Sequence, residues 1–213
     1  MKKYFYLLFI SILSCNTNFQ LQEGDLLFQD LVSSPLCDAI ELVTKGYKGA
    51  NLSHIGLIVS DDGKLKVLEA IPPRITLSEI NDFLNHSFDK NGNPKVIVGR
   101  LKYKFRRSIA SAISFAKKQL GVKYDEFFLI ENNSYYCSEL IYEAFKKDSI
   151  FQLQPMTFLH PENKDTLATW KNYYADLRVE IPQNEPGINP GVMSLSNKIE
   201  IVHIYGIPDG MEK

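Results

Sequence analysis

Two strand-like runs separated by a tight turn constrain the fold of this chain more than any other feature. Residues 53–60 read Ser-His-Ile-Gly-Leu-Ile-Val-Ser, and residues 65–71 form a second, mostly apolar run. Between them lies the turn-forming stretch Asp61-Asp62-Gly63-Lys64. Apolar runs joined through an Asp-Gly step are typical of a β-hairpin. The fold must therefore be built around an antiparallel pair of strands.

Other sequence patterns predict three further strands and four helices. The strands are expected within residues 24–28, 96–101 and 199–205, and the helices over residues 33–45, 77–85, 106–120 and 134–145. The helix over 106–120 is the clearest, because its apolar residues recur at helical spacing and Gly121 follows its end. This order predicts an α+β fold with a central antiparallel sheet and flanking helices.

The composition is that of an ordinary globular domain without a nucleic-acid partner. Hydrophobic residues make up 45% of the chain, charged residues 23%, and the net charge is -1. Phosphate binding needs clustered Lys and Arg, and no basic block stands out. We expect a single domain over residues 23–213, preceded by a linker over residues 16–22.

The N-terminus has the features of an export signal. Lys2 and Lys3 precede a largely apolar run over residues 4–13, which is shorter than the about 20 residues needed to span a bilayer and is typical of a secretory signal peptide. The following Ile12-Leu13-Ser14-Cys15 resembles the lipobox of bacterial lipoproteins, although a small residue is usual in place of Leu13. We expect residues 1–15 to direct export and a lipid on Cys15 to anchor the protein in the cell envelope. An ordinary signal peptide containing a cysteine is the alternative.

Cys137 lies where a helix is expected to begin. Ser134 is a suitable N-cap, which would make Cys137 the third helical residue. The first turn of a helix has unpaired N–H groups and a positive dipole end, so it favours a reactive thiolate and can bind an oxyanion. A buried structural cysteine is the alternative for this residue alone. An exported chain could also join Cys37 to Cys137 by a disulfide, but a reactive Cys137 and a buried, apolar Cys37 are preferred.

A thiolate nucleophile requires a general base, which is usually histidine. His86 and His160 lie in polar segments where exposure is expected, and His203 lies inside a predicted strand. His54 begins the first strand of the hairpin, and Gly56 after it permits another group to approach closely. His54 is therefore the preferred base.

The hairpin also predicts a partner for His54. If the turn contains an even number of residues, Ser60 pairs with Leu65, and His54 and Glu69 become diagonal neighbours on one face. Diagonal positions are about 7–8 Å apart, which a Glu side chain can bridge. Glu69 is the one charge in the otherwise apolar stretch Val67-Leu68-Glu69-Ala70-Ile71 and requires a partner. We predict that Glu69 orients His54 and stabilises its imidazolium; an odd turn would separate the two.

Six short motifs occur in an order that resembles the circularly permuted NlpC-type papain-like amidases of the YiiX-like group. The motifs are Gly24-Asp25-Leu26-Leu27-Phe28, Ser53-His54-Ile55-Gly56-Leu57-Ile58, Leu68-Glu69-Ala70, Gly99-Arg100-Leu101, Leu120-Gly121-Val122-Lys123-Tyr124-Asp125 and Tyr136-Cys137-Ser138-Glu139-Leu140. The histidine strand precedes the cysteine helix, the reverse of a standard papain-like chain. The resemblance covers residues 23–160 and depends on all six motifs together.

This resemblance implies a permuted papain-like fold and amide hydrolysis at a Cys137–His54–Glu69 site. Relatives of the permuted architecture instead transfer acyl groups on lipids, so a thiol acyltransferase or lipase-like enzyme is an alternative. A non-catalytic surface-binding lipoprotein is a third reading, but it would not need all three residues. A long apolar groove would favour a lipid substrate, and a small polar pocket would favour a peptide.

The resemblance also implies supporting residues in the cleft. Asp25, Tyr124 and Asp125 match family positions, and Tyr136 is a further candidate substrate-binding residue, for which core packing is the alternative. Residues 161–198, which include Trp170, could cover the cleft or pack on the sheet, and packing is preferred. No cofactor is expected, and no paired His or Cys at ligand spacing indicates a metal. We predict a cell-envelope cysteine peptidase or amidase, with cell-wall peptides a reasonable substrate by location.

Overall fold

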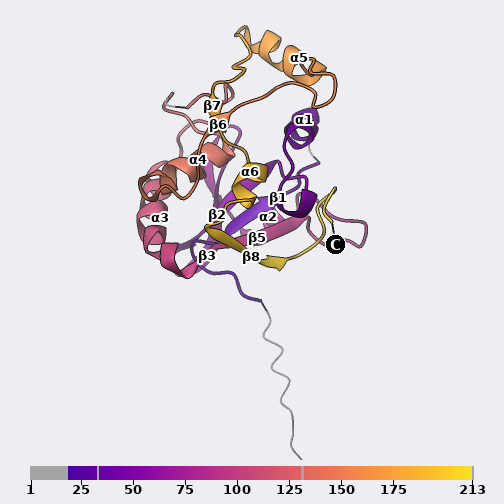
Figure 1. Ribbon diagram of the computed structural model, residues 1–213. Coiled ribbons are helices and arrows are strands. Elements are labelled where there is room, and N and C mark those ends of the chain that lie inside the picture. Colours follow the sequence, from indigo (N-terminus) through magenta and orange to yellow (C-terminus); the bar gives the residue numbers. More distant parts are fainter. Residues whose placement is uncertain (1–18, 33, 131, 213) are drawn as a thin grey trace, which may run out of the picture.

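A six-stranded antiparallel sheet in the order β4-β3-β2-β1-β5-β8 forms the centre of the molecule (Figure 1). The computed structural model describes residues 19–32, 34–130 and 132–212. The predicted signal peptide and Cys15 lie outside these residues. The strands of the sheet are β1 Leu26–Gln29, β2 His54–Asp61, β3 Lys64–Ile71, β4 Arg74–Ser78, β5 Val96–Leu101 and β8 Ile199–Ile204.

Helices and a small second sheet surround the central one. The α-helices are α1 Pro35–Val43, α2 Ile80–Leu84, α3 Ile109–Lys118, α4 Cys137–Phe145, α5 Ala168–Leu177 and α6 Pro190–Ser194. Three 3₁₀ turns are η1 Tyr47–Gly49, η2 Tyr103–Ser108 and η3 Lys146–Asp148, and β6 Gln154–Pro155 pairs with β7 Pro186–Gly187. Within the described part of the chain, no helix has the length and apolar character needed to cross a bilayer.

The β2–β3 hairpin has the predicted register. Asp61 pairs with Lys64, so the loop consists of Asp62 and Gly63, whose φ angles are 46° and 75°. Two consecutive positive φ values are typical of the type I′ turn that suits the right-handed twist of a hairpin. The even loop places Ser60 opposite Leu65, as the pairing predicted.

The segment after the hairpin differs from the prediction. Residues 77–85 were expected to form a helix, but the chain forms β4 over Arg74–Ser78 and only the short helix α2 over Ile80–Leu84. The strand forms because β4 pairs along β3, with Thr76 opposite Glu69. Leu77 and Ile80 therefore belong to different elements, although their spacing fits one helix.

The two faces of the sheet carry separate cores. On one face, the larger core includes Leu26, Leu57 and Leu68 from the strands and Ala112 and Leu140 from α3 and α4. The smaller core on the other face contains residues such as Leu27, Ile58 and Val67, which alternate with the first set along the same strands, and Phe83 of α2. The molecule is thus an α+β layered structure, as predicted.

The described end of the predicted linker lies against the sheet. Phe19 stacks on His203 of β8 with ring centroids 4.1 Å apart and ring planes only 3° apart. Phe19 and Leu21 also pack against the smaller core. Residues 19–22 are therefore attached to the domain at its β5–β8 side.

Part of the C-terminal region forms a third cluster away from the sheet. Trp170 and Tyr174 of α5 pack with Phe158 and with Ala39 of α1. Figure 1 shows α5 at the end of the molecule farthest from the central sheet, beyond β6 and β7. The expectation that this region packs on the sheet is wrong for α5, because its apolar side chains contact α1 instead.

Gly56 in β2 provides a stability test of the hairpin. A Cβ atom there would lie 2.3 Å from Val67 Cγ1 and 3.1 Å from Phe83 Cε2. We expect Gly56→Ala to lower the free energy of unfolding by about 1–3 kcal/mol, the usual cost of overpacking a filled core. Urea unfolding measures the change, and Ser114→Ala on the exposed side of α3 should change stability by less than about 0.5 kcal/mol. Equal stability of Gly56→Ala and the parent protein would contradict this packing.

Candidate active site

Cys137 is the first residue of α4 rather than the third, which corrects the predicted helix start. Ser134 does not cap the helix; its hydroxyl donates to Asn132 Oδ1 at 2.6 Å. Tyr136, with φ of -85° and ψ of 171°, is the extended residue that precedes the helix. Cys137 therefore lies at the end of α4 where backbone N–H groups have no acceptor within the helix and the dipole is positive.

His54 and Glu69 form a buried hydrogen-bonded pair. The distance between His54 Nε2 and Glu69 Oε2 is 2.6 Å, and the exposed fractions of the two residues are 4% and 0%. The ring of Phe83 lies 5.5 Å from the imidazole and covers it on the α2 side. Because Nε2 is bonded to Glu69, Nδ1 is the nitrogen left for the thiol.

The charges of the site stabilise one another. Burial by itself would lower the pKa of His54, but hydrogen bonds to Cys137 and Glu69 outweigh burial and raise this pKa above its ordinary value. Burial would raise the pKa of Glu69, but the hydrogen bond from His54 leads to a net lowering. The arrangement therefore favours an imidazolium held against a carboxylate at neutral pH.

Cys137 lies beside this pair. Its thiol faces the carbonyl oxygen of Ser53 at 3.9 Å, and Ser53 is the residue before His54. Cys137 is only 7% exposed. Cys37 and Cys137 are not joined by a disulfide. The residue before β2 thus meets the first residue of α4.

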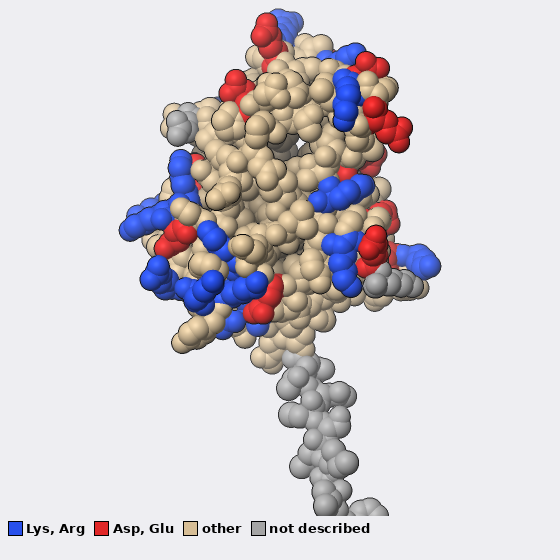
Figure 2. Space-filling view, viewed as in Figure 1, with Lys and Arg blue, Asp and Glu red and all other residues tan. Residues whose placement is uncertain are grey.

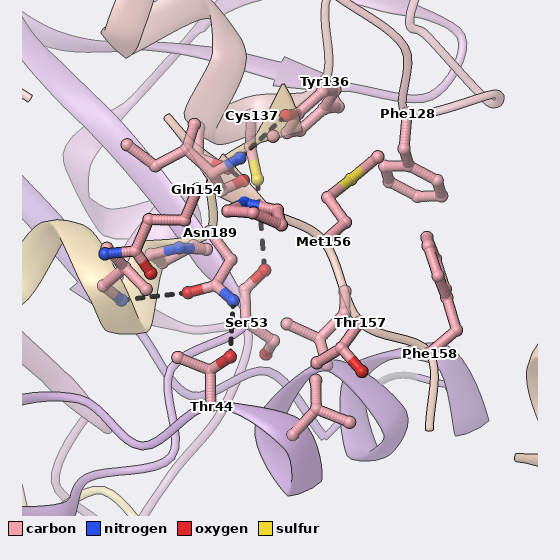
Figure 3. A pocket seen from close by; sticks show the side chains of 18 of the residues that line it. Thr44, Ser53, Phe128, Tyr136, Cys137, Gln154, Met156, Thr157, Phe158 and Asn189 are labelled. Carbon is pink, nitrogen blue, oxygen red and sulfur yellow. Dashed lines mark hydrogen bonds between the residues drawn. The ribbon is translucent and has the colours of Figure 1, made fainter. Parts of the chain in front are cut away.

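A cavity of about 330 Å³ opens beside Cys137 (Figure 3). Tyr124 and Tyr136 both line it, as does Ser138 next to the thiol. The structure therefore brings two of the three candidate substrate-binding residues to the nucleophile. Tyr136 is also almost fully buried, and burial raises its pKa well above the ordinary value, so it is a neutral phenol.

The two aspartates selected by the family resemblance lie elsewhere. Asp25 is not part of the cavity lining but accepts from Arg100 Nε at 2.7 Å and from Nη2 at 2.8 Å. This pairing links the start of β1 to β5 and suits a structural role. The carboxylate of Asp125 accepts from the backbone N–H groups of Phe127 and Leu129, each at 2.8 Å. Asp125 thereby holds the loop that carries Phe128 to the cavity.

Several cavity residues come from the C-terminal region, where sequence motifs gave no guidance. They include Met156, Phe158, Trp170 and Ile188. The aromatic residues of α5 are visible in the sequence and include Trp170. Their spacing does not distinguish a residue that lines a cavity from one that packs elsewhere. Met156 and Ile188 belong to no motif.

The sequence has a family assignment that agrees with this geometry. Residues 20–203 match the model of a family described as permuted papain-like amidase enzymes, YaeF/YiiX, C92. The chain belongs to this family. The family's description as amidase enzymes agrees with the predicted class of chemistry, and the predicted permuted papain-like fold is confirmed.

Two YiiX proteins illustrate the relationship. The chain is 28% identical over 127 residues to the uncharacterized protein YiiX of Escherichia coli strain K12, across 60% of this chain and 58% of that protein. A crystal structure described as the metalloprotein YiiX from Escherichia coli O157:H7 aligns with a TM-score of 0.70 and 22% identity, covering 88% of this chain and 99% of the other. This second comparison supports the fold.

The described residues of this chain do not fit a metal centre. No group of three or more His, Cys, Asp or Glu side chains among them has an arrangement that could hold an ion. In the site itself, His54 Nε2 is already engaged by Glu69.

Replacing Glu69 by Gln tests the buried pair through its pH dependence. We expect Glu69→Gln to have a free energy of unfolding about 1.5–3 kcal/mol lower than that of the parent protein, because the substitution removes a charge-assisted hydrogen bond. Because the pKa of His54 is raised in the folded protein, this difference in free energy of unfolding declines as pH rises above 6.5. Because the pKa of Glu69 is lowered, the difference also declines as pH falls below 4.5. The difference should thus be greatest between these values.

Urea unfolding across pH 4 to 9, together with NMR titration of His54, would measure both effects. Glu162→Gln, in an exposed loop, is the matched control and should show no comparable pH-dependent difference. A His54 titration that is the same in Glu69→Gln and in the parent protein would contradict the coupling.

Proposed function

We propose that this protein is a cysteine amidase in which Cys137 is the nucleophile, His54 the general acid and base, and Glu69 the residue that orients His54. The observation that carries the proposal is the buried His54, bonded to Glu69 on one side and adjacent to Cys137 on the other. A positive imidazolium beside a thiol favours the thiolate, which is the attacking species.

The reaction divides into acylation and hydrolysis. The thiolate of Cys137 attacks the amide carbonyl, and a carbon–sulfur bond forms while the carbonyl oxygen becomes an oxyanion. Backbone N–H groups at the start of α4 are positioned to stabilise this charge. The carbon–nitrogen bond then breaks, and the departing amine takes a proton from His54.

Water completes the cycle. Neutral His54 accepts a proton from water as the oxygen attacks the thioester, and the carbon–sulfur bond breaks to release the acid and restore the thiolate and imidazolium. Glu69 stays ionised and bonded to Nε2 throughout, which fixes the tautomer and directs Nδ1 toward the reacting atoms. Glu69 is thus a positioning residue.

Acyl transfer is a second candidate, because it shares the acylation step and differs only in the acceptor. An amine or hydroxyl group would replace water in the attack on the thioester. The observation that favours this candidate is the largely apolar lining of the cavity, which suits a lipid acyl group.

Alkylation with iodoacetamide at mildly acidic pH tests the nucleophile. Only a thiolate reacts rapidly there, so we expect one fast site, at Cys137, and loss of at least tenfold in rate in His54→Ala. Peptide mass spectrometry locates the label. Cys137→Ala should abolish the fast phase and the amidase activity, whereas Cys37→Ala should retain both. Undiminished fast labelling of Cys137→Ala would overturn the assignment.

We further propose that the protein is exported and anchored by a lipid on Cys15. The basic and apolar residues before Cys15 support this location. Labelling of cells with an alkyne fatty acid should mark the full-length protein and fail to mark Cys15→Ser, which should leave the membrane fraction. Cys37→Ser should be labelled and fractionated like the parent protein. Equal labelling of Cys15→Ser would refute the anchor.

A further inference from the structure

Positive charge is concentrated in one part of the chain. The net charge is -1, but residues 90–124 contain ten Lys or Arg residues and no Asp or Glu. The densest group within this stretch is η2 with the residue before it, Lys102-Tyr103-Lys104-Phe105-Arg106-Arg107. Figure 2 shows Lys and Arg side chains gathered at the lower left of the visible face. Such a local excess in a chain of nearly zero net charge indicates a surface for an anionic partner.

The basic side chains of this group face solvent. Lys102, Lys104, Arg106 and Arg107 are all exposed, and Tyr103 between them is 85% exposed. The Arg106 guanidinium lies over the ring of Tyr103, 6.0 Å from its centre. Among the described residues, no acidic side chain forms an ion pair with Lys102, Lys104 or Arg107. We call these five residues the η2 surface; most of its charge is available to a partner.

The η2 surface adjoins the segment through which the N-terminal part of the chain enters the domain. Arg100 of β5 lies two residues before Lys102 and donates from Nη2 to Gln20 O at 3.2 Å. Its guanidinium lies 5.7 Å from the centre of the Phe19 ring. Arg106 reaches back to this place, because its Nη2 lies 3.8 Å from Oε1 of Glu200, the residue opposite Arg100 in the β5–β8 pairing.

The other end of η2 lies against the same entering segment. A Cβ atom at Gly24 would be 2.7 Å from Ile109 Cγ2, so the backbone at Gly24 packs directly on this side chain. Ile109 is the first residue of α3 and follows η2 immediately. Residues 19–24 therefore run beside both ends of η2.

This position determines what the η2 surface would face in a lipid-anchored protein. Phe19 is four residues after Cys15, and an extended chain spans at most about 3.6 Å per residue, which limits their separation to about 14 Å. A lipid on Cys15 would therefore hold this side of the domain close to the bilayer. Anionic lipids attract Lys and Arg near a membrane surface, and tyrosine is enriched at the level of the headgroups.

We infer that the η2 surface docks on the anionic headgroups of phospholipids and so sets which face of the domain is turned to the membrane. The inference rests on the proposed lipid anchor and adds a second membrane contact to it. Nucleic acid is another polyanion, but the short reach from Cys15 to the η2 surface favours the bilayer. Salt at cellular ionic strength screens such surface attraction. The η2 surface is therefore expected to orient an anchored protein, not to retain an unanchored one.

Sedimentation with lipid vesicles at low ionic strength tests the surface. The full-length Cys15→Ser protein, which cannot carry the anchor, is compared with the same protein carrying Lys102→Glu, Lys104→Glu and Arg107→Glu. We expect Cys15→Ser to bind phosphatidylcholine vesicles with about 30% phosphatidylglycerol at least tenfold more tightly than pure phosphatidylcholine. The triple variant should lose at least tenfold in affinity for the mixed vesicles, and about 0.5 M NaCl should remove the difference.

A second triple variant controls for net charge. Lys90→Glu, Lys164→Glu and Lys171→Glu make the same change of charge at exposed positions outside the η2 surface. In the Cys15→Ser background, this control should bind the mixed vesicles within about threefold of its parent. Urea unfolding midpoints should agree among the three proteins. Equal loss of binding in the two triple variants would overturn the inference, because net charge alone would then explain it.

A fluorescent reporter tests the same contact without changing charge. Tyr103→Trp puts an indole at an exposed position, whereas the native Trp170 is only 3% exposed. Mixed vesicles should shift the added emission of Tyr103→Trp to shorter wavelength, and lipids brominated in their acyl chains should quench it. Val179→Trp, at a position 43% exposed and outside the η2 surface, should show neither effect. Vesicle binding without a shift in Tyr103→Trp would overturn the orientation.

The outcomes for the anchor and for the surface can be separated. Failure of fatty-acid labelling at Cys15 together with charge-dependent vesicle binding would overturn the anchor and support the surface. Labelling at Cys15 with no difference between the two triple variants would overturn the surface alone. A fluorescent DNA duplex of about 20 base pairs tests the other polyanion. Binding to this duplex that the η2 variant loses, with no binding to mixed vesicles, would overturn membrane docking in favour of nucleic acid.

Discussion

The buried hydrogen bond between His54 and Glu69 is the interaction on which the rest of the site depends. Both groups are withdrawn from water, and each compensates the desolvation of the other only while they remain paired. His54 and Glu69 are distant in sequence, and the hairpin brings them together. Its register is fixed by the two-residue turn at Asp62-Gly63. A slip of one residue would turn Glu69 to the opposite face and leave two unpaired buried groups. The register of the hairpin therefore determines whether the buried charges of the site are paired.

The nucleophile reaches this pair through packing rather than through local sequence. Helix α4 lies on the face of the sheet formed by the larger core, and its first residue is carried to the beginning of β2. Tyr136 and Ser138, on either side of Cys137, are both bonded to Ile188 of the C-terminal segment. The same residues that hold the thiol in place thus hold one wall of the cavity. Disturbing the C-terminal segment would affect both.

The sequence predicted those features that depend on local rules. The hairpin register followed from turn chemistry and alternation, and it was sufficient to pair His54 with Glu69. The start of α4 was misplaced because Ser134 looks like a cap, whereas Tyr135 bridges to Tyr124 and keeps the chain extended up to Tyr136. β4 was missed because its pairing with β3 overrides helical spacing. Asp25 was assigned to the cleft by resemblance alone, since its partner Arg100 is distant in sequence.

Local sequence rules could not predict the cavity, for a physical reason. Its walls come from α1, α4, the loop at Phe128 and the segments around β6, β7, α5 and α6, which meet only in the folded state. Catalysis needs charges that are fixed in relation to one another, and the strands of one hairpin supply them. The cavity is built differently, because aromatic, aliphatic and uncharged polar side chains from distant segments supply most of its described walls. Cys137 lies at the boundary between these two environments, so the C-terminal segment contacts the helix start that carries the thiol, whereas the hairpin alone pairs His54 with Glu69.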